Sequence, residues 1–129
     1  MFGNLFNNKS NLNLLIFSII LLIIDQVSKA MIVSQFDLYE SISVAPFFNL
    51  TFVVNYGFAF GFLNSPSLNQ IIVSIVILSI IIYFLYLLIK TQDHFFKICL
   101  VLILSGAVGN FLDRIFRGYV VDFIDIYVF

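Results

Sequence analysis

Two carboxylates in an otherwise apolar stretch are the first residues of this sequence that could carry out chemistry. Asp122 and Asp125 lie in Val-Val-Asp-Phe-Ile-Asp, residues 120–125. Apolar surroundings favour the neutral form of a carboxyl group, and such a group can accept and return a proton. Basic residues shortly before this stretch could compensate the charge of Asp122. The stretch therefore indicates acid–base chemistry by carboxylates.

A second group combines an amide, an acid and two guanidinium groups. In a helix, Asn110, Asp113 and Arg117 share one face with Gly106, and Arg114 lies beside that face. The small residues that precede Asn110 would let another backbone approach closely. A purely structural polar cluster at a helix end is one interpretation. The variety of polar groups favours a functional site.

A third group lies at the end of the first apolar run. Asp25 and Lys29 are four residues apart, so an acid and a base share one helical face in the order that stabilises a helix. Two interpretations fit this pattern. The ion pair could lower the cost of placing the helix end in the membrane interface, or it could hold the helix end against a polar site.

Other reaction types have no suitable residues. The chain has one histidine, His94, and one cysteine, Cys99, so neither a Ser–His pair nor a disulfide is available. We interpret His94 as a loop residue beside Asp93 and Cys99 as a buried hydrophobe. No spacing typical of metal ligands or of a phosphate-binding loop occurs, so we expect no metal and no cofactor.

The elements that position these groups must lie in a membrane. Of the 129 residues, 62% are hydrophobic and 10% are charged, and the mean hydropathy is +1.12. Soluble domains are about one quarter charged, so this chain could not cover a water-exposed surface. The net charge of −1 also argues against nucleic acid as a partner. The length allows three or four spans of about 20 residues each.

Three apolar runs predict transmembrane helices over about residues 12–31, 70–89 and 95–113. The first run also resembles a signal peptide, with a basic residue before it and Ser28-Lys29-Ala30 after it. Charged residues crowd that point, and the rest of the chain is also membrane-embedded. We therefore expect an uncleaved first span within a single membrane domain, residues 1–129.

A fourth apolar segment, about residues 44–63, has a different pattern. Its large apolar residues recur with a period of two, which is typical of a strand with one apolar face. Gly57 and Gly61 suggest a bend, a bulge or a second strand; alternatively, they form a Gly-x-x-x-Gly packing motif in a helix. An open strand cannot cross lipid, so we place this β segment at the membrane surface. The alternating residues are Phe48, Leu50, Phe52, Val54, Tyr56, Phe58, Phe60 and Phe62.

The distribution of basic residues predicts the orientation. Lys9 precedes the first span, and Lys90 and Lys97 flank the loop between the second and third spans. Since cytoplasmic loops collect lysine and arginine, the N-terminus is expected in the cytoplasm and residues 34–69 outside it. Arg114 and Arg117 then fall on the outer side, which indicates a local role for them.

Taken together, these residues resemble a known family, the bacterial lipoprotein signal peptidases (signal peptidase II). The resemblance covers essentially the whole chain, and four motifs occur in the family's order at matching spacing. They are Asp25-Gln-x-Ser-Lys29, Asn55-Tyr-Gly57-Phe-Ala59-Phe60, Gly106-Ala-Val-Gly109-Asn110-Phe-Leu-Asp113-Arg114 and Val120-Val121-Asp122-Phe123.

The resemblance implies a multi-pass aspartic endopeptidase of the bacterial inner membrane, with its site at the outer face and an extracytoplasmic β cradle that contacts membrane lipid. Such enzymes cut prolipoproteins before a diacylglyceryl-modified cysteine, using two aspartates that activate a water. By motif match, Asp122 is one catalytic aspartate. The site-shaping residues are Asn110, Asp113, Arg114, Asn55, Gly57, Asp25 and Lys29.

The resemblance also predicts a difference from the family. The second catalytic aspartate belongs to an Asn-x-Ala-Asp motif at the start of a fourth span, and this motif is not among the 129 residues. The sequence thus resembles a C-terminally truncated member, open on one side of the site, and we expect it to be inactive alone. The alternatives are a catalytically dead fragment and a small membrane transport or assembly protein.

Overall fold

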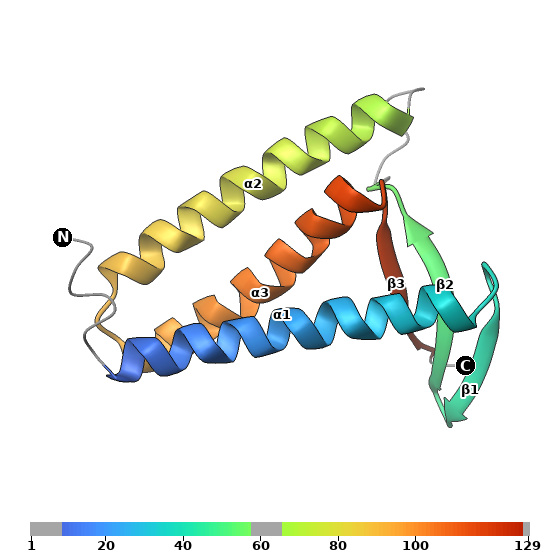
Figure 1. The fold of residues 1–129 in the computed structure, drawn as a ribbon, viewed down its shortest axis with the longest axis horizontal. Helices are drawn as coiled ribbons and strands as arrows, with labels where there is room; N and C mark the ends of the chain where they lie inside the picture. The colour runs from blue at the N-terminus through green and yellow to red at the C-terminus, as the bar shows by residue number, and fades with distance from the viewer. Residues whose placement is uncertain (1–8, 58–65, 128–129) are drawn as a thin grey trace.

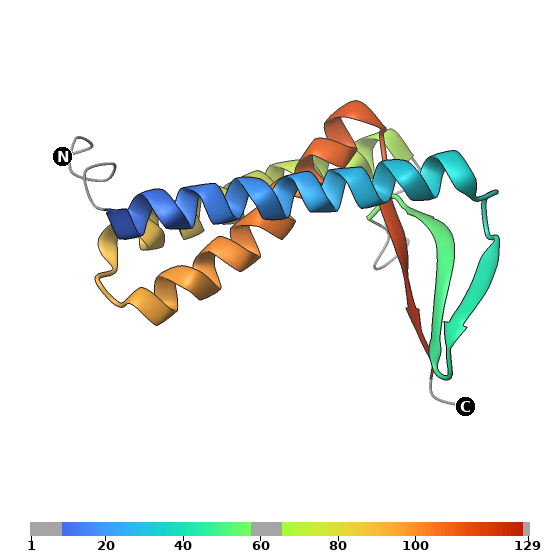
Figure 2. The same cartoon turned by 60° about the horizontal axis from the view of Figure 1, so that its bottom comes forward.

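Three long helices lie side by side, and a small antiparallel sheet lies at one end of them (Figure 1). The computed structural model describes residues 9–57 and 66–127. The helices are α1 (Lys9–Gln35), α2 (Pro66–Lys90) and α3 (His94–Phe116), and the strands are β1 (Ser41–Ala45), β2 (Phe48–Asn55) and β3 (Val120–Ile126). Figure 2 shows the sheet projecting from the ends of α1 and α3.

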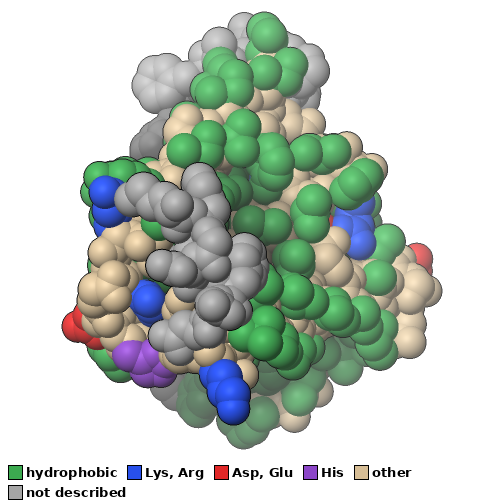
Figure 3. Space-filling model, turned by 60° about the vertical axis from the view of Figure 1, so that its left-hand side comes forward, with side chains coloured by type: hydrophobic (Ala, Val, Ile, Leu, Met, Phe, Trp, Pro, Cys, Tyr) green, Lys and Arg blue, Asp and Glu red, His purple; other side chains and the backbone are tan. Residues whose placement is uncertain are grey.

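The three helices are each long and apolar enough to cross a membrane. They extend beyond the predicted ranges of 12–31, 70–89 and 95–113, and the added residues are both polar, such as Lys9 and Arg114, and apolar, such as Ile32 and Phe116. α3 packs against both α1 and α2. Many of their large aliphatic side chains are exposed, as lipid-facing side chains would be, and Figure 3 shows one largely hydrophobic face.

The connection between α2 and α3 is very short. The Asp93 carboxylate accepts a hydrogen bond from the Phe96 N–H at 3.1 Å and so caps α3. The interpretation of His94 as a loop residue was wrong, because this cap makes it the first residue of the helix. Its Nδ1 lies 3.3 Å from Ser10 Oγ at the start of α1.

The sheet has the strand order β1-β2-β3, with both pairs antiparallel. The predicted β segment of about 44–63 forms two strands, since β1 begins at Ser41 and a turn containing Phe47, with φ of 70°, separates it from β2. The strand interpretation holds over 48–55, and residues 58–63 lie outside the described residues. β3, which contains Asp122, was not predicted as a strand.

A bulge in β2 changes which residues face the helices. The register with β3 shifts between Leu50 and Val53, so Leu50 pairs with the exposed Ile124 while Val54 pairs with the buried Val121. Residues 121 and 124 lie on opposite faces of a strand, because side chains alternate. The prediction of one continuous apolar face was therefore wrong, since one extra residue reverses the alternation.

The face that contains Val121 packs on the end of α1. Ile32, Phe52 and Val121 form a buried cluster, with exposed fractions of 6%, 7% and 2%. Partly buried Phe36 and Phe123 pack against this cluster. These contacts attach the sheet to the first helix.

The cluster predicts unequal effects of two phenylalanine substitutions. Phe52→Ala leaves a cavity in the cluster and is expected to lower the free energy of unfolding by about 3–5 kcal/mol. Phe48→Ala is the matched control, because Phe48 pairs with the exposed Ile126 on the other face. Its expected cost is at most about 1 kcal/mol. Thermal unfolding in detergent tests this, and equal costs would contradict the assigned faces.

Candidate active site

A buried ion cluster joins α1 to α3 at the sheet end of the helices. Lys29, which is 3% exposed, places its Nζ 2.8 Å from Asp113 Oδ2 and 3.0 Å from Asp25 Oδ2. The same ammonium group donates to Asn110 Oδ1 at 2.9 Å. The structure thus brings together four of the predicted site-shaping residues. Lys29 is the shared donor, and Asp25, Asn110 and Asp113 are its acceptors.

Asp113 is fully buried and is neutralised from two sides. Lys29 contacts one of its carboxylate oxygens, and Arg117 donates from Nη1 to the other. Gln26 Nε2 donates to Asp113 Oδ1 at 3.3 Å, and Gln26 Oε1 accepts from Arg117 at 3.2 Å. The positive charges of Lys29 and Arg117 balance the negative charges of Asp25 and Asp113. Such pairing lowers the free-energy cost of burying charged groups in a membrane.

Gly109 allows the two helices to approach at this cluster. A Cβ at position 109 would lie 2.3 Å from Asp25 Oδ2, so only glycine leaves room for that carboxylate. Gln26 Nε2 also donates to the Gly109 carbonyl at 3.2 Å. The close approach of α1 therefore explains why position 109 of the motif is a glycine.

The cluster also fixes the start of β3. The Val121 N–H donates to Asp113 Oδ2 at 3.4 Å, and the Arg117 N–H donates to the Asp113 carbonyl at 2.8 Å. Between them, Gly118 has a φ of +83°, which favours glycine and turns the chain from α3 into the strand. Asp113 thereby determines where the next residue of β3, Asp122, is placed.

Asp122 is exposed and faces Asn55 of the neighbouring strand. Asn55 Nδ2 donates to Asp122 Oδ2 at 2.9 Å, while Asn55 Oδ1 accepts from the Gly57 N–H at 2.7 Å. Gly57, with a φ of +84°, thus orients the amide so that its NH₂ group points to the carboxylate. Arg114 interacts electrostatically with both Asp122 and Asp113, and its Nη1 donates to the Asn110 carbonyl at 3.2 Å.

Asp125 belongs to a different part of the sheet. It accepts hydrogen bonds from Asn49 Nδ2 and Thr51 Oγ1, both at 3.2 Å. Being three residues from Asp122 in one strand, it lies on the opposite face. The two carboxylates therefore do not converge on a common point.

Sequence reasoning assigned no role to Gln26 or to the Asn49–Thr51 pair. Gln26 lies inside the first motif, next to Asp25, which was the available signal for it. Asn49 and Thr51 alternate with the large apolar residues of the β segment, and nothing in that pattern indicates a bond to Asp125. Within the described ranges, no group of three or more His, Cys, Asp and Glu side chains could hold a metal ion.

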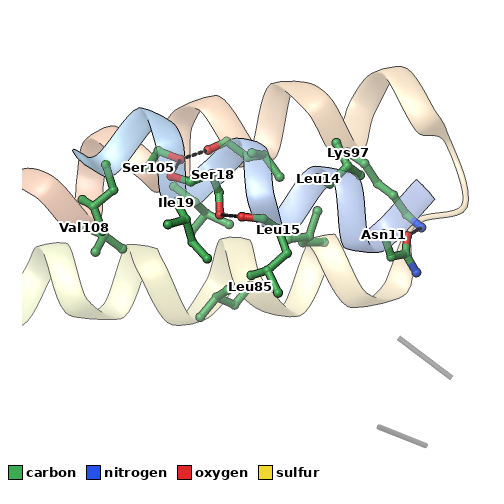
Figure 4. Close-up of a pocket in the computed structure, with 13 residues that line it drawn as sticks. Asn11, Leu14, Leu15, Ser18, Ile19, Leu85, Lys97, Ser105 and Val108 are labelled. Carbon is green, nitrogen blue, oxygen red and sulfur yellow. Dashed lines mark hydrogen bonds between the residues drawn. The ribbon is translucent and has the colours of Figure 1, made fainter. Parts of the chain in front are cut away.

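An apolar groove of about 350 Å³ lies between the three helices, towards the end opposite the sheet (Figure 4). Leu15 and Ile19 of α1 face Leu85 of α2 across it, and Asn11 and Lys97 lie at one end. Lys97 Nζ donates to Asn11 Oδ1 at 3.2 Å. The groove suits an apolar chain or helix, and Lys97 is the one ionisable side chain among its described lining residues.

These features define a polytopic membrane protein with an exposed carboxylate beside a buried ion cluster, and its relatives are membrane enzymes. Two solved structures titled as a bacterial membrane enzyme, at 2.3 and 1.9 Å resolution, match with TM-scores of 0.73 and 0.75 and 34% identity. The matches cover 90% and 88% of this chain and 71% and 74% of those chains.

The family model "Signal peptidase (SPase) II" matches residues 17–129. The lipoprotein signal peptidase of Pasteurella multocida (strain Pm70) is 43% identical over 123 residues, 93% of this chain and 74% of that protein. That of Haemophilus influenzae (strain ATCC 51907) is 40% identical over 125 residues, 94% and 72% of the two chains. The chain belongs to the signal peptidase II family, a family of membrane proteases. The predicted family, membrane fold and protease class are thus confirmed, and the chain is an inner-membrane protein.

The Asp25–Gly109 contact predicts that one methyl group on α3 is destabilising. Gly109→Ala forces Asp25 away from Lys29 and is expected to lower the free energy of unfolding by about 1–3 kcal/mol. Gly106→Ala is the control in the same helix, because its Cβ meets no described atom within 4 Å. Thermal unfolding in detergent measures both variants, and a similar loss in each would contradict the role of this contact.

The buried ion cluster predicts a large cost for removing its lysine. Lys29→Met leaves the carboxylate of Asp113 short of one cation, and we expect the free energy of unfolding to fall by about 3–5 kcal/mol. Lys9→Met, at the exposed start of α1, is expected to change it by less than about 0.5 kcal/mol. Chemical denaturation in mixed micelles compares the two. A cost below about 1 kcal/mol for Lys29→Met would contradict the described cluster.

Proposed function

We propose that this protein acts in removing the signal peptide from diacylglyceryl-modified prolipoproteins, and that Asp122 is one carboxylate of the catalytic dyad. The proposal rests mainly on the Asp122–Asn55 contact, since it holds an exposed carboxylate in a fixed orientation at the sheet end of the helices. Family membership supports the reaction class, and the relatives' printed name, lipoprotein signal peptidase, supports the substrate.

The proposed hydrolysis requires two carboxylates that share one proton. Ionising both together is costly when they are close, so one stays protonated while the other is a base. The base takes a proton from water as its oxygen attacks the scissile carbonyl carbon, and the acid donates a proton towards the substrate. In this scheme Asn55 orients Asp122, and the charge of Arg114 stabilises negative charge near it.

The partner of Asp122 is not among the other six acidic residues. Asp113 and Asp25 are held by Lys29, and Asp125 faces away on β3. Asp93 caps α3 at the other end of the helices. The remaining two, Asp37 and Glu40, are joined by the Asp37 N–H to Glu40 Oε2 bond in the connection before β1. In this proposal the described residues supply one carboxylate of the dyad, Asp122.

The orientation in the membrane belongs to the same proposal. Lys9, Lys90 and Lys97 lie at the end of the helices opposite the sheet, and this end is expected to face the cytoplasm. The sheet and Asp122 then lie at the outer face, where an exported prolipoprotein presents its signal peptide junction. Arg114 and Arg117 are on that outer side because they serve Asp113 and Asp122, which explains their exception to the charge rule.

A chimera tests Asp122 directly. The part of this chain that matches the Pasteurella multocida relative replaces the matched part of that protein, whose remaining chain is kept. We expect this chimera to cleave a diacylglyceryl-modified precursor, with cleavage falling about 10²–10⁴-fold in Asp122→Asn, because the base is lost. Asp125→Asn is the matched control and should stay within about tenfold, since it disturbs only the side-chain hydrogen bonds with Asn49 and Thr51.

Mass spectrometry of the released signal peptide measures cleavage. The 129-residue chain alone, assayed in parallel, is expected to give none, because no second carboxylate faces Asp122. An Asp122→Asn chimera as active as the unsubstituted one would overturn the proposal. Cleavage by the chain alone that both substitutions abolish would instead make Asp122 and Asp125 the dyad.

A further inference from the structure

The end of the helices opposite the sheet is basic, whereas the sheet end is acidic. Of the six basic and seven acidic residues, Lys9, Lys90 and Lys97 lie at this far end with a single acid, Asp93. The Asp93 carboxylate is already engaged as the cap of α3. Figure 3, in which this end is turned forward, shows the histidine and basic side chains on it. This end of the molecule is therefore suited to attract an anion.

The apolar groove between the three helices reaches this basic end. Two serines line the groove, Ser18 and Ser105, and their hydroxyls donate to carbonyls three and four residues earlier in their own helices, at 2.9 and 2.7 Å. The other polar lining residues, Asn11 and Lys97, lie together at one end of the groove (Figure 4). A ligand that matches this lining is apolar along its length and polar at one end.

Lys97 carries a positive charge that no carboxylate of the described residues neutralises. Its side chain is partly buried along the groove, and the hydrogen bond described for its Nζ is the one to Asn11 Oδ1, at 3.2 Å. Lys29, in contrast, contacts two carboxylates at the sheet end. Because an ammonium group has three N–H donors, Lys97 can also donate to an anionic group at the end of the groove.

His94 adds a second donor at the same place. His94 and Lys97 are three residues apart, so they share one face of α3. Their side chains contact consecutive residues of α1, since His94 Nδ1 lies 3.3 Å from Ser10 Oγ and Lys97 donates to Asn11. When Ser10 donates to Nδ1, the proton of the neutral ring is on Nε2, which can then donate to a ligand. The two side chains thus form a pair of donors at the start of α1.

An anionic phospholipid combines an acyl chain that matches the groove with a phosphate that matches these donors. We propose that the groove binds one acyl chain of an anionic phospholipid, with the phosphate at Lys97 and His94. Free phosphate would leave the apolar walls unoccupied, and an apolar helix would leave the charge of Lys97 uncompensated. The volume of about 350 Å³ is within the range of ligand pockets, about 300–1,000 Å³. The proposal does not depend on a catalytic role of Asp122.

The test compares phosphatidylglycerol with phosphatidylcholine of the same acyl chains, because the choline cation offsets the phosphate charge in the second lipid. Native mass spectrometry of the full chain in detergent counts the lipids bound and gives the affinity for each. We expect one phosphatidylglycerol to bind about five times more tightly than phosphatidylcholine. Equal affinities, or no retained lipid of either kind, would overturn the proposal.

Two lysine variants separate a site from a generally basic surface. Lys97→Gln is expected to reduce the preference for phosphatidylglycerol to below about twofold. Lys90→Gln is the matched control, because it removes the same charge at the same end. Lys90 is exposed, lies 5.7 Å from the centre of the Tyr86 ring and does not line the groove, so the preference should remain. A preference that survives Lys97→Gln, or that falls equally in both variants, would overturn the proposal.

A second pair of variants tests the acyl chain and does not depend on the folding of Lys97→Gln. Leu85→Trp fills part of the groove and is expected to weaken both phospholipids at least about fivefold. Ile82→Trp is its control, because Ile82 is exposed on α2 and does not line the groove. Glycerol phosphate, which has the headgroup's phosphate and no acyl chain, is added as a competitor and should not displace phosphatidylglycerol. Its displacement by glycerol phosphate at equal concentration, or unchanged binding to Leu85→Trp, would overturn the proposal.

Discussion

An unpaired charge cannot remain buried in a helix that crosses a membrane, and the rest of this structure depends on how that constraint is met. Lys29 on α1 and Asp113 on α3 neutralise each other at 2.8 Å, so the two helices must meet at one height and in one rotation. Gly109 is small because the carboxylate of Asp25 occupies the space beside it. Arg117 closes the other side of Asp113, at the point where α3 ends. A single charge balance thus sets the packing of two spans and the exit of the chain towards the sheet.

The structure separates the buried carboxylate of the ion cluster from the exposed carboxylate that we propose as catalytic. Asp113 is fully buried and saturated with partners, which makes it unsuited to exchanging a proton with a substrate but well suited to holding Val121. Asp122, one residue later, is exposed and keeps one defined partner, Asn55. Asn55 in turn is oriented by the N–H of Gly57. The buried cluster, in which the charges balance, thus contacts the strand whose exposed carboxylate is the proposed catalytic group.

Much of this arrangement could be predicted from the sequence, because its strongest signals are local. Apolar runs predicted the three spans, and the alternation of large apolar residues predicted the strand at 48–55. The motifs contained Asp25, Lys29, Asn110 and Asp113, which the structure brings together. Partner choice was not predictable, since Lys29 could have bonded only Asp25, four residues away, as in an isolated helix. The bulge between Leu50 and Val53 has no clear sequence signal, and it reverses which residues face α1. β3 was missed because a short apolar stretch with two acids resembles a loop until its pairing with β2 is known.

We infer that the buried ion cluster holds the strand that carries Asp122. Hydrogen exchange of individual amides in Asp113→Asn is the measurement, with α2 as an internal reference because the hydrogen bonds and ion pairs described for Asp113 run to α1, α3 and β3. We expect the amides of β3, above all Val121, to exchange at least about tenfold faster, while those of α2 keep their protection. Unchanged protection of β3 in a variant whose α2 is also unchanged would contradict the claim, since the strand would then be held by the sheet alone.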